Sequence, residues 1–337
     1  MAEATSLPLS AAGLAEFGLG LSPDLRAPLP TCLVLGNFDG VHIGHQAILA
    51  AAREDATRRN VALTAITFEP HPRTVIDPGL DFRLLSTFDL RRRLLVERGV
   101  DRLWVIPFDE LLRRMTPDAF MDRLRERLEI ETMVVGPTFS IGKGAEGQLD
   151  FLRSYAAQAG FGVRVVEPLS WQGAPVSSSA VRRQLAQGAL DAVHAMLGRP
   201  LQVLGEVVRG SGLGRQLGFP TANVQFSANQ ALPEDGVYVM ELTTEQGVTQ
   251  GAVGSIGTRP HFGGVERRFE VHCLEDPGDL YGQLVLVSVL RKVRAQETFV
   301  SDQALVARMT SDAQAAAVYL AGRGPVGPPP GASGGAG

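Results

Sequence analysis

The stretch LVLGNFDGVHIGHQAIL, residues 33–49, determines how the first part of the chain folds. An apolar run ends in Gly-Asn-Phe-Asp-Gly, and two of the chain's six histidines, His42 and His45, follow within a few residues. The apolar run predicts a short buried strand ending at about Gly36, and Gly44–Arg59 predicts a helix. Because ligands of open α/β sheets bind beyond the carboxyl ends of strands, and free N–H groups begin each helix, this turn predicts an anion site.

The same alternation of strand and helix continues to about residue 166. Short, continuously apolar strands between amphipathic helices predict a parallel sheet covered on both faces. Ser86 with Asp89, and Thr116 before Pro117, are start signals for two of the helices. The strands are expected at 32–36, 61–68, 102–106, 132–135 and 163–166.

Near residue 200 the pattern changes to strand-like runs separated by Gly, Pro and Asp turns, with no helix pattern between them. Such runs predict a small antiparallel barrel, and a helix over 301–321 follows it. The five runs are 201–210, 236–244, 250–257, 267–275 and 283–294.

The predicted fold class is therefore α/β plus β, in two domains. The domain limits are expected at 31–190 and 198–321. Residues 1–30 form an irregular lead segment, and the Gly/Pro-rich tail 322–337 is expected to be disordered.

Length and composition agree with a two-domain globular protein. The chain has 337 residues, 45% of them hydrophobic, and its net charge of −4 argues against a nucleic-acid partner. Cys32 and Cys273 are the only cysteines, which excludes a disulfide framework or thiol zinc site and suits the cytoplasm. No signal peptide or membrane-spanning run is visible, so no membrane partner is expected. We expect a monomer or weak homo-oligomer.

The glycines and histidines of 33–49 suit phosphate binding. Gly36, Gly40 and Gly44 let the backbone approach a phosphate closely. His42 and His45 lie three residues apart at the helix start, so both side chains can donate hydrogen bonds to phosphate oxygens. Two alternatives stay open at this point: a metal site that adds Asp39 and His71, or a purely structural histidine pair.

Four elements, taken in order, resemble a known family. GNFDGVHIGH is similar to the His-x-Gly-His signature of nucleotidylyltransferases, in the form found in bacterial bifunctional riboflavin kinase/FAD synthetases. TFEPHPR at 67–73, VVGPTFSIGKGAEG at 134–147 and PVSSSAVRRQL at 175–185 resemble the family's later elements. Each alone has a plainer interpretation, such as an N-cap for the serines or a solvated loop for Lys143.

The resemblance implies a Rossmann-like nucleotidylyltransferase domain at 31–190. This sequence differs from the family pattern at four positions, Thr138, Ile141, Ser179 and Ala180. The implied flavin contacts are Pro70, His71, Thr138 and Phe139. The implied ATP contacts are Gly36, Asn37, Phe38, Asp39, Gly40, His42, Gly44, His45, Ser177, Ser178 and Arg182.

The stretch GEVVRGSGLGRQLGFPTANV, residues 205–224, suggests a second phosphate site. Pro220 stiffens the chain before Thr221, and Thr221 and Asn223 project oxygen donors to one side at strand spacing, which suits Mg²⁺. Two hydrogen-bonding turn residues are the alternative. Backbone amides of the glycine loop are free to hold ATP phosphates. The loop glycines are Gly210, Gly212, Gly214 and Gly218.

This stretch resembles the riboflavin kinase signature with its Pro-Thr-x-Asn core. GSIGTRPHF at 254–262, with His261 in place of Thr, FEVHCLE at 269–275 and DLYGQLVLVSVLRKVRAQETF at 279–299 resemble further elements of that kinase. The resemblance implies that Glu270 is the catalytic base and that Arg294 approaches the flavin or nucleotide. A solvent-facing strand glutamate and a surface arginine are the plainer interpretations.

The resemblance implies two consecutive reactions. Riboflavin and MgATP give FMN and ADP in the barrel, and FMN with a second ATP gives FAD and pyrophosphate in the α/β domain. The partners are riboflavin, FMN, FAD and ATP, with Mg²⁺ as cofactor. Three alternatives stay open. The chain could keep only one activity, or it could bind flavin without turnover. Residues 33–190 could also be a pantetheine- or nicotinamide-type adenylyltransferase, but the attached barrel argues against that.

Overall fold

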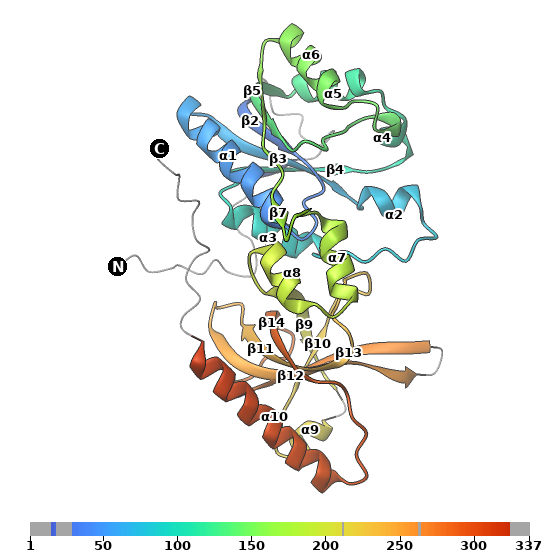
Figure 1. Cartoon of the computed structure of the whole chain (residues 1–337), viewed down its shortest axis with the longest axis vertical. Coiled ribbons are helices and arrows are strands. Elements are labelled where there is room, and N and C mark those ends of the chain that lie inside the picture. Colours follow the sequence, from blue (N-terminus) through green and yellow to red (C-terminus); the bar gives the residue numbers. More distant parts are fainter. Residues whose placement is uncertain (1–14, 18–28, 211, 262–263, 324–337) are drawn as a thin grey trace. The chain divides into compact units, whose positions relative to one another are not determined.

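A computed structural model of the chain describes residues 15–17, 29–210, 212–261 and 264–323 (Figure 1). These residues form two compact units. Within the described ranges, one comprises the residues of 11–84 and 88–178, and the other comprises 85–87 and the residues from 179 onward. No helix within the described ranges is long and apolar enough to cross a membrane.

The first unit is built on a parallel sheet of six strands in the order β1-β4-β3-β2-β5-β6. Every neighbouring pair is parallel, which confirms the predicted sheet. Its core contains Trp104, which is 2% exposed, together with leucine, isoleucine and methionine side chains from strands and helices. The strands are β1 (Ala15–Phe17), β2 (Leu29–Leu35), β3 (Ala62–Glu69), β4 (Arg102–Pro107), β5 (Leu128–Val135) and β6 (Gly162–Val165).

The strand order creates a switch point at the carboxyl ends of β2 and β5. After β2 the chain adds β3 and β4 on one side, and β5 then pairs on the other side of β2. Ligands of open parallel sheets bind at such a point. The loops that begin at Gly36 and Gly136 both leave the sheet here, so the topology brings two predicted binding stretches to the same edge.

Helices connect the strands, and α5 begins with the cap that the sequence indicates. The Thr116 hydroxyl accepts a hydrogen bond from Ala119 N at 3.3 Å, and Pro117 occupies the first turn. The helices are α1 (Ile43–Arg59), α2 (Pro72–Ile76), α3 (Phe88–Glu97), α4 (Glu110–Arg114), α5 (Pro117–Arg125) and α6 (Leu149–Ala159), with a 3₁₀ turn at Lys143–Ala145 and a small hairpin of β7 (Ser170–Trp171) and β8 (Ala174–Pro175).

The second unit is a closed antiparallel barrel in the order β10-β13-β12-β11-β14-β9. Side chains alternate along each strand, so Tyr238 and Met240 are buried on the inner face of β11 while Val237 and Val239 pack against Ala316 of α10 on the outer face. Its elements are α7 (Ser178–Ala186), α8 (Leu190–Leu197), β9 (Leu201–Val208), α9 (Leu213–Gln216), β10 (Ala222–Gln225), β11 (Gly236–Thr243), β12 (Thr249–His261), β13 (Gly264–Cys273), β14 (Leu284–Arg294) and α10 (Asp302–Gly322).

Four expectations need correction. The lead segment is not wholly irregular, because β1 pairs with β4 and β2 already begins at Leu29. The barrel has six strands instead of five, since the short β10 closes it. The helix α9 interrupts the run of strands. The first long helix begins at Ile43, one residue before Gly44. Residues 324–337 of the predicted tail lie outside the described residues.

Candidate functional site

The loop after β2 adopts a backbone that most residues avoid. Phe38, Gly40 and Val41 have φ angles of 49°, 77° and 39°. A β-branched residue such as Val41 is rarely found in this left-handed region, and such strain persists only where surrounding contacts over-determine it. Phe38 and Asp39 are 1% exposed, so the loop is packed firmly at the switch point of the sheet.

The two predicted histidines lie face to face at the start of α1. Their ring centroids are 3.7 Å apart with an interplanar angle of 18°. His42 is the N-cap, and its Nδ1 accepts a hydrogen bond from His45 N at 3.4 Å, which places the proton of the neutral ring on Nε2. The Phe38 ring meets His45 edge-on at 5.3 Å. The prediction that both imidazoles share one face is therefore confirmed.

His45 is kept neutral by its surroundings. Burial, and secondarily the neighbouring His42, lower the pKa of His45 well below its usual 6.5. Its buried Nδ1 has no hydrogen-bond partner among the described residues. An unpartnered buried nitrogen is costly unless a ligand satisfies it, so this atom fits a site that binds a polar group.

Gly44 provides space for His42, in addition to any role in phosphate binding. A Cβ on Gly44 would lie 3.2 Å from the Cε1 and Nδ1 atoms of the His42 ring. Ser178 holds the loop from another side, because its hydroxyl donates to the Asp39 carbonyl at 2.8 Å. A hydroxyl has one proton to donate, so Ser178 supports the loop in this arrangement, and its predicted contact with ATP is limited to accepting hydrogen bonds.

The remaining predicted residues of the first site are less closely grouped. Ser177 is exposed beside Ser178, whereas Arg182 lies on α7 in the other compact unit, so its place near the histidines stays a prediction. Asn37 directly precedes the strained loop. Gly36 lies under the Phe38 ring, which a Cβ would touch at 3.4 Å.

Of the predicted flavin contacts, His71 and Phe139 are buried and Pro70 and Thr138 are exposed. His71 is the N-cap of α2 and packs on the Phe82 ring at 4.7 Å. Phe139 is 9% exposed and belongs to the core of the first unit, which already explains its burial. A contact of these residues with flavin stays a prediction.

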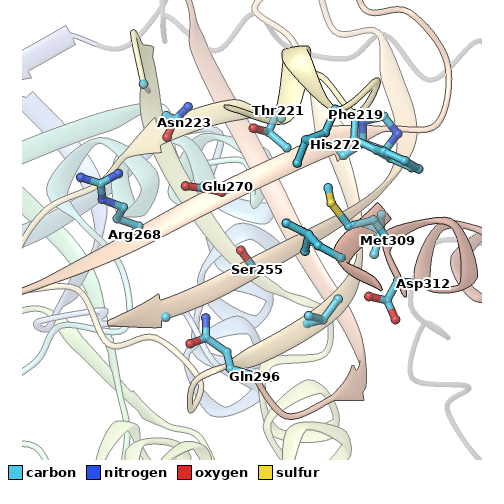
Figure 2. Close-up of a pocket in the computed structure, with 18 of the residues that line it drawn as sticks. Phe219, Thr221, Asn223, Ser255, Arg268, Glu270, His272, Gln296, Met309 and Asp312 are labelled. Atoms are coloured by element: carbon cyan, nitrogen blue, oxygen red, sulfur yellow. The ribbon is translucent and has the colours of Figure 1, made fainter. Parts of the chain in front are cut away.

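A cavity of about 510 Å³ opens on the outer face of the barrel, beside α10 (Figure 2). It brings together most of the residues predicted for the second site, although they lie far apart in sequence. Only Gly218 of that set is not in its lining. The predicted residues that line it are Gly210, Gly212, Gly214, Thr221, Asn223, Glu270 and Arg294.

Strand register explains why these side chains meet. Glu270 of β13 pairs with Asn223 of β10 on one side and with Ser255 of β12 on the other. Ser255 pairs with Val237 of β11, which in turn pairs with Arg294 of β14. Paired residues of neighbouring strands point to the same face, so one row across five strands lines the cavity.

The central polar side chains of this row are available to a ligand. Thr221, Asn223 and Glu270 form no side-chain hydrogen bond or ion pair with any residue that the structure describes. Their oxygens face the same cavity (Figure 2). Hydroxyl, amide and carboxylate oxygens are the donors that Mg²⁺ prefers, so the predicted Thr221 and Asn223 pair fits this ion, with Glu270 adjacent.

Two loop glycines are required by neighbouring side chains. A Cβ on Gly210 would lie 2.2 Å from Asn223 Nδ2, and one on Gly214 would lie 3.1 Å from Thr221 Oγ1 and 2.4 Å from the Phe219 carbonyl. Gly212 and Gly218 instead have positive φ angles of 74° and 82°. The loop therefore packs closely on the proposed magnesium ligands.

Arg294 is held by a partner that the sequence did not indicate. Asp312 of α10 accepts hydrogen bonds from Arg294 Nε at 3.1 Å and from Nη2 at 2.7 Å. The side chains are 11% and 6% exposed, so this is a buried ion pair at the wall of the cavity. A direct contact between Arg294 and a ligand stays a prediction.

Other residues of the sites were missed by sequence reasoning or given no role by it. His272 Nδ1 donates to the Pro220 carbonyl at 2.8 Å and so fixes the residue before Thr221. Arg268 and Ser255 line the same cavity. In the first unit, Arg91 is 1% exposed and contacts the start of the strained loop. Arg268 and His272 each lie two residues from Glu270 along the strand, so the alternation of side chains in a strand could have placed both on the same face as Glu270.

The histidine–aspartate metal alternative finds no support. Across the described part of the chain, no three His, Cys, Asp or Glu side chains come together in a way that could hold a metal ion. The first site is therefore interpreted through its strained loop and histidine pair.

Comparisons with known proteins agree with this division into two sites. Residues 25–180 match the family described as FAD synthetase, and residues 197–320 match the family described as Riboflavin kinase. A bifunctional riboflavin kinase/FMN adenylyltransferase of Pseudomonas fluorescens is 36% identical over 89% of this chain and 96% of its own length. The protein of that name from Escherichia coli (strain K12) is 35% identical over 85% of this chain and 92% of its own length.

A solved structure supports the fold of the whole chain. The crystal structure of a macrolide-efflux protein from Streptococcus pneumoniae aligns with a TM-score of 0.80 and 27% identity, covering 90% of this chain and 98% of that one. Together with the relatives above, which are matched over nearly their full length, these findings establish one conclusion: the chain belongs to the family of bifunctional riboflavin kinase/FMN adenylyltransferases.

Proposed function

We propose that this chain makes FAD from riboflavin in two ATP-dependent steps, the first in the barrel at 198–321 and the second in the domain at 31–190. The observation that carries the proposal is the row Asn223–Glu270–Ser255 in the barrel cavity, with its unpaired oxygens. ATP is the phosphate donor of the first step and the adenylyl donor of the second.

In the first step, Glu270 acts on the 5′-hydroxyl of riboflavin. Its carboxylate accepts the hydroxyl proton as that oxygen attacks the γ-phosphorus of ATP, and ADP leaves. Gly210, Gly212 and Gly214 line the cavity beside Thr221, and their backbone amides are proposed to contact the phosphates. Thr221 and Asn223 would hold Mg²⁺, which supplies charge neutralisation for the phosphates when bound.

The second step needs no nucleophile from the protein, because a phosphate oxygen of FMN attacks the α-phosphorus of ATP and pyrophosphate leaves. Catalysis therefore depends on positioning and charge stabilisation. The histidine pair at the start of α1 offers N–H donors, and free helix N–H groups add a further anion site. The Asp39–Gly40 backbone and Ser177 are proposed phosphate contacts, and Arg182 is a further ATP contact that the family resemblance implies.

We further propose that the chain works in the cytoplasm as a monomer or weak homo-oligomer, without nucleic acid. Cys32 and Cys273 are both buried free thiols, which suits a reducing compartment.

The test is incubation of the purified chain with riboflavin, ATP and Mg²⁺, followed by chromatography of the flavins. FMN should form first and FAD second. Glu270→Gln should block FMN formation while FAD still forms from supplied FMN, and the double variant His42→Ala, His45→Ala should do the reverse. If either variant stays folded and loses both steps, the assignment of one reaction to each unit is wrong.

A further inference from the structure

Arg91 is a buried cation that the proposed reaction does not yet use. It lies on α3, its side chain is 1% exposed, and its ion-pair partner Glu69, at 2.6 Å, is 38% exposed. Burying a guanidinium is expensive, and a pair of this kind commonly contributes little net stability. Stability alone therefore gives a weak reason for a charge at this position.

The guanidinium joins two segments at the carboxyl edge of the sheet. Its Nη1 donates to the Asn37 carbonyl at 3.2 Å, at the entrance of the strained loop. Its Nη2 donates to the Phe68 carbonyl at 3.4 Å and to the Glu69 carboxylate, both at the end of β3. The planar fork of arginine suits this task because it holds several acceptors in fixed directions.

The contact matters because the loop that follows Asn37 is strained. Side chains hold three alternate carbonyls of this loop. Arg91 and the Thr67 hydroxyl hold Asn37 O, Ser178 holds Asp39 O, and Gln46 holds Val41 O at 2.8 Å. Of these donors only Arg91 carries a charge, and charge-assisted hydrogen bonds are the stronger ones.

We propose that Arg91 is a positioning residue for adenylyl transfer, which fixes the entrance of the strained loop against β3 and thereby sets the placement of His42 and His45. The inference rests on the proposed second reaction, in which the histidine pair contacts the phosphates. The guanidinium donates to the Asn37 carbonyl, the Phe68 carbonyl and the Glu69 carboxylate, so its effect reaches the reaction through the loop.

Arg93 provides a matched control on the same helix. It is also largely buried, at 10% exposure, and pairs with the 38% exposed Glu97 at 2.8 Å. Glu97 lies on α3 itself and not in the loop. Arg93→Met therefore removes a similar buried charge pair without touching the entrance of the loop.

The experiment compares Arg91→Met with Arg93→Met in the full chain, with the melting temperature as the measure of folding and FMN formation as a control for the barrel. Misplacing a catalytic group by about 1 Å can cost on the order of 100-fold in rate. We expect Arg91→Met to lower kcat for FAD formation by roughly 10- to 100-fold with a smaller change in KM for ATP, since the histidines act on the transition state. Equal kcat values for FAD formation in Arg91→Met and Arg93→Met would overturn the proposal.

The double variant Arg91→Met, Glu69→Gln separates positioning from charge burial. It also removes the carboxylate that Arg91→Met leaves without its partner, so its melting temperature should recover, and it serves as the test protein if Arg91→Met does not fold. We expect its FAD formation to stay low. Recovery of both stability and FAD formation would show that Arg91 only balances Glu69, and would refute a positioning role.

A spectroscopic readout makes the inference independent of turnover. The chain has six histidines, so their imidazole nitrogens can be resolved by NMR after ¹⁵N-histidine labelling. Arg91→Met should shift the signals of His42 and His45 while Arg93→Met leaves them in place, and unshifted signals in both would contradict the proposal. A wild-type chain that makes no FAD would defeat the proposed function, but these spectra would still decide the role of Arg91.

Discussion

Replacing Gly210 by alanine should disable the kinase site without unfolding the barrel. A Cβ at this position would lie 2.2 Å from Asn223 Nδ2, 2.5 Å from its Cγ and 2.6 Å from its Oδ1. Gly210 is not among the glycines with positive φ, so its backbone accepts alanine. The clash must therefore be relieved by the amide of Asn223, which has no side-chain hydrogen bond to the described residues that would hold it.

The size of the effect follows from the displacement. Ordinary van der Waals contact begins at 3.4 Å, so the amide nitrogen must move by about 1.2 Å from its 2.2 Å position. A shift of about 1 Å in a positioned group can cost on the order of 100-fold in rate, or ~2.7 kcal/mol of transition-state stabilisation. Since the amide is the flexible end of a side chain, stability should change by less than about 1 kcal/mol.

A double-mutant cycle on FMN formation tests this reasoning. Gly210→Ala and Asn223→Ala should each lower kcat/KM by roughly 100-fold and weaken the dependence on Mg²⁺, but the double variant should be no worse than Asn223→Ala. FAD formation from supplied FMN monitors the other unit. The steric explanation is refuted if Gly210→Ala lowers kcat/KM for FMN formation by the same factor in the Asn223→Ala variant as in the wild type. In that variant no amide is left to displace.

Three further outcomes are expected. Asp312→Ala should lower the free energy of unfolding by about 3–5 kcal/mol in urea titration, because it leaves Arg294 buried without its main partner; no loss would mean that water already solvates the pair. Gly44→Ala should reduce FAD formation and spare FMN formation, since the added carbon contacts the neighbouring histidine ring at 3.2 Å. Burial lowers the pKa of His194 to about 4 and that of His45 well below 6.5, so below pH 6.5 the unfolded chain takes up protons that the folded chain excludes. The melting temperature should therefore fall between pH 7 and pH 5, and His194→Gln should reduce that fall. If the melting temperature of His194→Gln falls with pH as steeply as that of the wild type, this explanation is wrong.

Local sequence was sufficient where an element is long and its ends are marked. The strand that ends at Leu35 and the helix 43–59 follow each other along the chain, so hydrophobic pattern and turn residues identified both, although the strand begins at Leu29 and the helix at Ile43, earlier than expected. The short strands were missed for the opposite reason. Ala15–Phe17 and Ala222–Gln225 have three and four residues, too few to show alternation, and only pairing with distant strands stabilises them.

The same limit applies to the sites. Glu270 was identified through its motif, but Ser255 becomes its neighbour through strand register, which depends on the closure of the whole barrel. Asp312 meets Arg294 because α10 folds back onto the barrel. Arg91 belongs to a run of three arginines, a pattern typical of a solvated helix face, and only the tertiary structure shows that its guanidinium is buried.

The glycines of both sites share a physical role that the sequence alone did not indicate. Gly44 lies against the His42 ring, and Gly210 lies against the Asn223 amide. A glycine that only supplies flexibility tolerates many neighbours, whereas one that makes room for a particular side chain is coupled to that side chain. The coupling implies that harm caused by a glycine substitution should disappear when its partner side chain is truncated, for Gly44 with His42 as for Gly210 with Asn223. In both units, then, the position of a glycine reports where a functional side chain lies flat against the backbone.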